Sequence, residues 1–166
     1  TGDFTIPNNT TINNWLNSAT GSDACGSVVI TNNYSATGYS DLCGATGIQV
    51  VTFTATDACG LTSTCTKTIT IVDTTPPTID CSGVNDLVME CVSESNYPAQ
   101  IEAWIAAAKL TILADPQTDD ACDIDLGVED NYNGTSVPPL SCNLSTGLTV
   151  MFTVSDECGN TATCTK

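Results

Sequence analysis

The sequence predicts a mainly β protein that consists of two tandem, disulfide-stapled β-sandwich modules. Three observations lead to this prediction. The stretch VTFTATDACGLTSTCTK (residues 51–67) returns at the end of the chain as VMFTVSDECGNTATCTK (residues 150–166). Polar and apolar residues alternate in the repeated stretch, as they do in half-buried strands. The chain also has 10 cysteines, an even number that is typical of a disulfide framework in an oxidising compartment.

The repeat divides the chain into two modules, which we place at residues 1–75 and 76–166. The boundary lies in DTTPP (residues 73–77), because consecutive prolines cannot donate to a sheet and favour an extended spacer. Modules this small bury a limited core, so staples are expected. The chain begins without Met and stops within the last repeated strand. We therefore expect it to be one unit of a longer tandem array.

Each repeated stretch is expected to form a hairpin, with threonine on the outer face of the first one. In the second module a helix is expected over residues 98–109, where apolar residues follow a helical spacing. Pro98 suits its first turn. One or two turns of helix are also expected in the first module, because Ile12, Trp15 and Leu16 follow a helical spacing and Thr10 or Thr11 could cap them. The pattern Ile-x-x-Trp occurs in both modules. The stretch 78–91 is expected to form a strand, a turn and a second strand.

The tryptophans of the two Ile-x-x-Trp patterns, Trp15 and Trp104, are expected to fill the cores of their modules. Trp104 lies farther from the next cysteine than Trp15 does. The second module therefore carries an insertion that lengthens its helix.

Internal comparison of the modules suggests how the cysteines pair. Cys81 and Cys91 have no counterpart in the first module and are expected to bond to each other. Across the first hairpin we expect Cys59–Cys65, because the alternation places both residues on the inward phase of their strands. Four cysteines allow three pairings, so the rest follow by elimination and analogy. The predicted pairs are Cys25–Cys43, Cys59–Cys65, Cys81–Cys91, Cys122–Cys142 and Cys158–Cys164.

The charge balance excludes several classes of function. The chain has 3 lysines, no arginine and 19 acidic residues, which gives a net charge of −16. A nucleic-acid backbone or an anionic membrane surface would be repelled. No apolar stretch approaches the length of a membrane span. Because histidine and arginine are absent, the usual catalytic base and anion clamps are missing, and we expect no enzymatic activity.

Calcium is the best cofactor candidate, because it takes several carboxylate ligands. One group of aspartates crowds the loop around Cys122, although the spacing does not match an EF-hand. A second group flanks the proline linker or occupies the hairpin turns, where the alternative is that each side chain caps its own turn. The candidate ligands are Asp57, Asp73, Asp80, Asp119, Asp120, Asp123, Asp125 and Asp156.

The string VTFTATDACG…STCTKTITIVDTTPP resembles the repeats of large Bacteroidetes surface adhesins, including SprB-like gliding-motility proteins. It is also similar to the hyalin repeat, an immunoglobulin-like module. The resemblance covers residues 51–77 and 150–166 well, and the helical segments poorly. It implies immunoglobulin-like sandwiches, a place on the extracellular cell surface, and a role in adhesion or in a stalk. Because modules of this type usually lack the expected helix, their disulfide pattern is not carried over.

The sequence therefore predicts a non-enzymatic structural segment of a tandem-repeat surface adhesin or filament. Its partners would be neighbouring repeats or copies of itself. The alternative is an adhesive module that binds a surface or a glycan directly.

Overall fold

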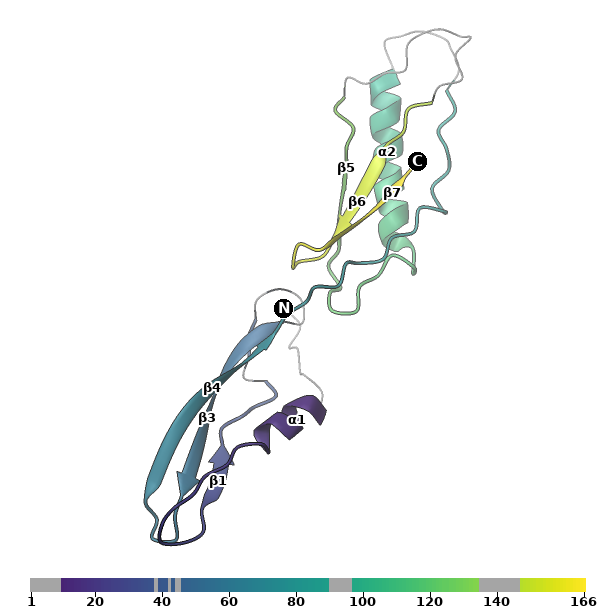
Figure 1. Cartoon of the computed structure of the whole chain (residues 1–166). Coiled ribbons are helices and arrows are strands. Elements are labelled where there is room, and N and C mark those ends of the chain that lie inside the picture. The colour runs from purple at the N-terminus through teal and green to yellow at the C-terminus, as the bar shows by residue number, and fades with distance from the viewer. Residues whose placement is uncertain (1–9, 38, 42, 44–45, 90–96, 135–146) are drawn as a thin grey trace. The chain divides into compact units, whose positions relative to one another are not determined.

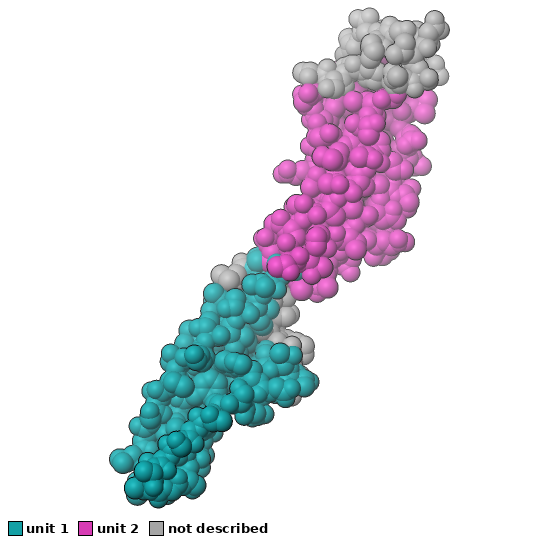
Figure 2. Space-filling view, in the orientation of Figure 1, with its two compact units in different colours: residues 1–73 teal, residues 74–166 magenta. Residues whose placement is uncertain are grey.

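The computed structural model describes residues 10–37, 39–41, 43, 46–89, 97–134 and 147–166. The chain divides into two compact units, Thr1–Asp73 and Thr74–Lys166, which Figure 2 shows in two colours. The division falls within the DTTPP linker. Each unit contains one copy of the repeated hairpin, and each is described by itself below.

Unit 1 is organised around a long antiparallel hairpin (Figure 1). Strand β3 (Gly47–Thr56) pairs with β4 (Thr62–Ile71) along its whole length. Along its other edge, β3 pairs with two shorter strands at its opposite ends. Strand β2 (Ser40–Asp41) pairs with the start of β3, and β1 (Val29–Asn32) pairs with its end. The two ends of β3 therefore have different neighbours.

The core of unit 1 is small. Val51 and Phe53 on β3 are buried, whereas the intervening positions are partly or fully exposed, as the alternation predicted. Helix α1 (Thr10–Leu16) places Trp15 edge-on against Phe53, with ring centroids 5.4 Å apart. By contrast, β4 is exposed from Thr62 to Thr68. Much of the sheet surface on β4 is therefore uncovered.

Unit 2 packs a three-stranded antiparallel sheet against a long helix (Figure 1). The strands lie in the order β5 (Gly127–Asp130), β6 (Met151–Ser155) and β7 (Thr161–Thr165). Helix α2 (Tyr97–Ala114) begins one residue before the predicted range and ends five residues after it. The helix continues because Ile112 extends the apolar stripe by one more turn.

The core of unit 2 is larger than that of unit 1. It joins the apolar stripe of α2 to the inward side chains of β6 and to the segment that follows the linker. An ion pair between Lys109 on α2 and Asp130 on β5 (2.7 Å) closes one side. The buried members of this core are Cys81, Val84, Ile101, Ile105, Ala108, Ile112, Val150, Phe152 and Val154.

Two expectations about the architecture are corrected. Residues 78–89 form no strand, because this segment packs through single side chains instead of pairing its backbone with a sheet; residues 90 and 91 lie outside the described part. In addition, each unit contains one sheet among the residues described here, and in unit 2 a helix faces that sheet. A facing second sheet is therefore not formed by these residues. Across the same described ranges, the helices are too short or too polar to cross a membrane.

Candidate functional site

In both hairpin turns the aspartate Oδ1 accepts a hydrogen bond from the backbone N–H four residues later. In unit 1, Asp57 Oδ1 accepts hydrogen bonds from the backbone N–H groups of Cys59 (2.9 Å) and Leu61 (2.8 Å). In unit 2, Asp156 accepts from the backbone and side-chain nitrogens of Asn160, both at 2.8 Å. The interpretation that these aspartates cap their own turns is therefore confirmed.

A glycine in the left-handed region completes each turn. Gly60 has φ 83° and Gly159 has φ 85°, a conformation that other residues adopt only at a cost. The backbone N–H of each glycine donates to the carbonyl of the aspartate three residues earlier. The repeated letters D-x-C-G thus encode one local structure, which occurs twice.

The register behind the turns is also repeated. Phe53 on β3 lies opposite Cys65 on β4, and in unit 2 Phe152 lies opposite Cys164. Directly opposed residues project from the same face of a sheet and contact each other. Trp104 lies edge-on to Phe152 (6.0 Å between centroids), just as Trp15 lies against Phe53. Each unit therefore places a phenylalanine, a tryptophan and a cysteine in equivalent positions.

The two cysteines of this arrangement differ in bonding. Cys164 forms a disulfide with Cys81, and their Cα atoms are 6.3 Å apart. Cys65 is an exposed thiol. The predicted pairs Cys81–Cys91 and Cys158–Cys164 are consequently wrong in this structure. The extra cysteine of the second module bonds to a repeated one, because the segment after the linker lies against the sheet face that carries Cys164.

The pair Cys59–Cys65 is also absent, because both are exposed thiols. Cys59 lies in the turn, whereas Cys65 lies three residues beyond the first strand position, Thr62. Three residues of strand span about 10 Å, and a disulfide requires Cα atoms within about 7 Å. A cross-hairpin bridge at this spacing would need the strand to deform.

The pair Cys25–Cys43 is wrong for a similar reason. Cys25 is an exposed thiol near the hairpin turn, because the adjacent Gly26 lies against Ala58. Cys43 follows β2, which pairs with the opposite end of β3. The remaining predicted pair, Cys122–Cys142, is not formed either, because Cys122 carries a thiol. Cys142, like Cys91 of the Cys81–Cys91 pair, lies outside the described residues.

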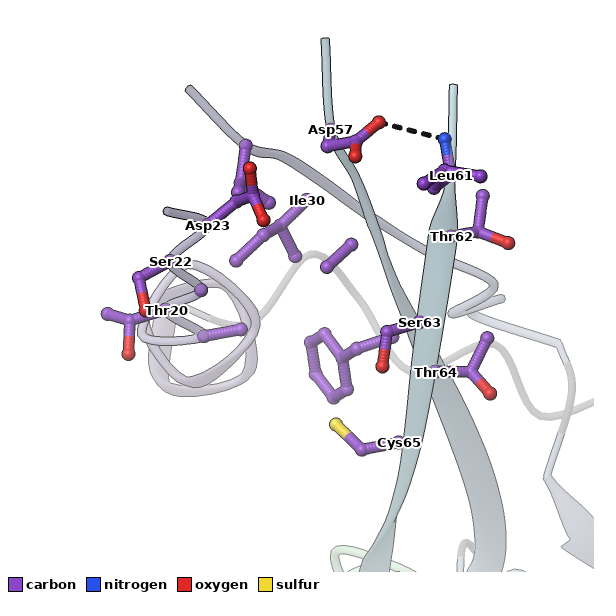
Figure 3. A pocket seen from close by; sticks show the side chains of 15 residues that line it. Thr20, Ser22, Asp23, Ile30, Asp57, Leu61, Thr62, Ser63, Thr64 and Cys65 are labelled. Carbon is purple, nitrogen blue, oxygen red and sulfur yellow. Dashed lines mark hydrogen bonds between the residues drawn. The ribbon is translucent and has the colours of Figure 1, made fainter. Parts of the chain in front are cut away.

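Beside Cys65, unit 1 has a groove with a volume of about 440 Å³ (Figure 3). Segment 19–23, strand β1 and the hairpin form its walls. The apolar residues Val28, Ile30, Phe53 and Ala55 line it together with hydroxyl groups and two carboxylates. Figure 3 shows the Cys65 sulfur and Ser63 on the same side of β4, next to this groove.

Most of the predicted calcium ligands in unit 2 accept hydrogen bonds from the backbone. Asp120 Oδ1 accepts from the N–H groups of Cys122 (2.7 Å) and Asp123 (3.1 Å). Asp123 in turn accepts from Asp125 N–H and from Glu157 N–H, which ties the loop to the hairpin turn. A ligand atom of Asp120 and one of Cys122 lie within 4.8 Å of each other. The geometry thus explains this acidic loop as a set of capped turns.

The remaining predicted ligands are Asp73, Asp80 and Asp119. Asp80 caps a turn by accepting from the N–H (2.7 Å) and the hydroxyl (2.9 Å) of Ser82, and these bonds lower the pKa of its carboxyl. The backbone of Asp119 forms hydrogen bonds with Thr78: its carbonyl accepts from Thr78 N–H, and its N–H donates to Thr78 Oγ1. Asp73 is the last residue of unit 1.

Two tyrosines of unit 1, Tyr34 and Tyr39, lie next to each other. Burial raises the pKa of the Tyr39 phenol, and the neighbouring phenol of Tyr34 raises it further. Their rings lie edge to face, with centroids 6.4 Å apart. This edge-to-face arrangement is a packing contact between two aromatic rings.

No family model, curated protein or solved structure matches this chain. The resemblance to adhesin repeats accordingly stays a prediction from the sequence motif.

Proposed function

We propose that this chain is a non-enzymatic structural segment of an extracellular tandem-repeat adhesin or filament. The observation that supports the proposal most directly is the duplication of one hairpin in two separate units. Turn cap, strand register and aromatic pair are the same in both copies. A repeated scaffold with variable coverings is typical of proteins whose modules contact their neighbours.

The cell-surface location is part of the proposal. A disulfide inside the core of unit 2 favours an oxidising compartment, as does the total of 10 cysteines. The immunoglobulin-like character of each module and the link to gliding-motility adhesins rest on the sequence resemblance. Neighbouring repeats, or further copies of this chain, are the partners that we propose.

Electron microscopy of the native assembly tests the structural role. We expect regularly spaced densities about one module long, with defined contacts between successive modules. Isolated flexible strings without such contacts would contradict the proposal. Copies of this chain joined in tandem by their own termini provide a control, because they show whether the modules alone produce the spacing.

An adhesive module is the second candidate, and one observation favours it. The groove of unit 1 is lined by hydroxyls of Thr20, Ser22, Thr62, Ser63 and Thr64 and by the carboxylates of Asp23 and Asp57. Such groups can bind sugar hydroxyls. However, Phe53 is only 6% exposed and already packs against Trp15, so it offers no free face for stacking on a sugar. Saturable binding of this chain to a glycan array would favour the adhesive role.

Calcium remains a proposed cofactor of this structural role, and its support is the density of carboxylates. Each capping carboxylate in the acidic loop has lone pairs beyond those that accept backbone N–H groups. If calcium binds there, removing it with a chelator lowers the melting temperature of unit 2, and added calcium restores it. A melting temperature that is the same in chelator and in calcium contradicts calcium binding. Asp120→Asn serves as a matched variant, since it keeps a capping oxygen but removes the charge.

A further inference from the structure

Unit 2 shows what covers the sheet face beside the repeated cysteine. Residues 79–84 run past β7 and place three side chains against the core. Cys81 bonds to Cys164, Val84 is 4% exposed, and Ile79 packs against the same cluster. The segment contains no strand, so no ladder of backbone hydrogen bonds joins it to the sheet.

Hydrogen bonds hold this segment in shape. Asp80 caps the turn at Ser82, and the backbone N–H of Asp80 donates to Thr118 Oγ1 (3.0 Å). The backbone N–H of Val84 donates to the carbonyl of Cys81 (3.1 Å). Cys81 is thereby presented at the centre of a short, ordered segment whose apolar residues lie on both sides of it.

Among the residues of unit 1 that the structure describes, the same sheet surface lacks this covering. Cys65 occupies the position of Cys164, opposite a buried phenylalanine that contacts a tryptophan, yet it is an exposed thiol. The other cysteines in residues 1–73 are Cys25, Cys43 and Cys59. Cys59 is an exposed thiol in the turn, and Cys25 is an exposed thiol near that turn. None of these is placed as Cys81 is placed in unit 2.

The groove in this surface has room for a bound segment. The groove next to Cys65 has a volume of about 440 Å³, within the range of peptide and ligand sites. Its floor consists of Val28, Ile30, Phe53 and Ala55, which would pack against apolar side chains. The groove is the counterpart, in unit 1, of the surface that Cys81 and Val84 cover in unit 2.

We propose that the groove of unit 1 binds a cysteine-bearing segment of a partner polypeptide, which becomes linked to Cys65 by a disulfide. The segment has the pattern of Ile79–Val84: an apolar residue, a spacer, a cysteine, two spacers and an apolar residue. This inference rests on the proposed structural role and names the contact through which the segment would join its neighbour.

The covalent step is a thiol–disulfide exchange. The Cys65 thiolate attacks the cysteine sulfur of the partner segment, which carries a small thiol in a mixed disulfide. A new disulfide forms between Cys65 and the partner, and the small thiol leaves as its thiolate. The mixed disulfide supplies the oxidising equivalent, so no further oxidant takes part.

The test uses the full chain and a peptide of residues 78–89, TIDCSGVNDLVM, whose cysteine carries a 2-thiopyridyl leaving group. Release of the thiopyridone gives the rate, and peptide mapping by mass spectrometry identifies the cysteine that reacted. The control peptide carries Ile79→Asp and Val84→Asp, which keep its length and leaving group. Cys59, an exposed thiol in the same unit, is the internal control for simple reactivity.

We expect Cys65 to react about tenfold faster with the native peptide than with the control, which corresponds to about 1.4 kcal/mol of binding. Cys59 should react with both peptides at the same rate. Equal rates of the two peptides at Cys65, or the same preference at Cys59, would overturn the proposal.

A pair of variants tests whether the groove causes the preference of Cys65 for the native peptide. Ser63 and Thr66 are both exposed on β4. They are three positions apart, so their side chains project from opposite faces of the sheet, and Ser63 lines the groove. Ser63→Trp should abolish the preference of Cys65, whereas Thr66→Trp should retain it. Retention of the preference in Ser63→Trp refutes a role for the groove. Ordered filaments without a peptide preference would refute this inference while leaving the structural role intact.

Discussion

Removing the Cys81–Cys164 disulfide should destabilise unit 2 by several kilocalories per mole. The bridge joins residues separated by 83 positions, so it closes a long loop. Under the loop-entropy relation, a loop of this length restricts the unfolded chain by about 4.5 kcal/mol at 25 °C. This value approaches the total stability of many small domains, about 5 kcal/mol at the lower end. Unit 2 should thus be close to unfolding without the bridge.

The assay compares the double variant Cys81→Ala/Cys164→Ala with the native chain during urea unfolding. Trp104 reports on unit 2, because its ring lies against Phe152 and its indole N–H donates to the carbonyl of Asn85 (2.8 Å). Trp15→Phe removes the signal of unit 1. With a urea dependence of about 1 kcal/mol per molar, the midpoint should fall by about 4 M.

The matched control is Cys59→Ala, which removes an exposed thiol from a turn and should change the free energy of unfolding by less than about 0.5 kcal/mol. The reasoning is refuted if the double variant loses less than 1 kcal/mol. A second check is chemical. In the single variant Cys81→Ala, a thiol reagent should label Cys164, which is protected in the native chain.

Three further predictions concern single side chains. Phe152→Ala should destabilise unit 2 by about 4 kcal/mol, because Phe152 is fully buried. Phe53→Ala should destabilise unit 1 by about 3 kcal/mol, because the core around Phe53 is smaller. Urea unfolding followed through the tryptophan of each unit measures both losses, and a larger loss for Phe53→Ala would contradict the ranking. Asp156→Ala should cost about 2 kcal/mol and Asp57→Ala about 1 kcal/mol by thermal unfolding, because Asp156 is the more buried of the two turn caps; no loss for either would mean that the turn glycines alone hold the hairpin. The pKa of the Asp80 carboxyl is lower in the folded chain than in the unfolded chain. Its contribution to stability is therefore complete above the unfolded pKa and disappears as pH falls through the folded pKa. The difference in unfolding free energy between the native chain and Asp80→Asn should shrink in acid, and a difference that grows as pH falls would refute the sign.

Much of the secondary structure could be predicted from the sequence, because it depends on local pattern. The alternation around Phe53 correctly identified the buried side of β3, and the apolar spacing around Ile105 correctly predicted a helix. The turns followed from D-x-C-G, since an aspartate and a glycine at these positions satisfy each other's geometry.

The disulfide pairing could not be predicted in the same way, because it depends on which segment covers which face. Cys81 and Cys164 lie at opposite ends of unit 2 in the sequence, and the spacing of the cysteines contains no information about that contact. One signal was available. Cys164 lies three residues after the base of the turn, on the same face as Phe152, so its partner had to come from a facing layer and not from its own hairpin.

The Cys81–Cys164 bridge also has a mechanical consequence. It encloses nearly all of unit 2, which spans Thr74–Lys166. If tension along the chain unfolds this unit, the residues inside the loop cannot extend while the disulfide is intact. The bridge thus withholds about 280 Å of contour length, from 83 residues at about 3.4 Å each. Unit 2 can lose its fold under load and still transmit force as a short tether.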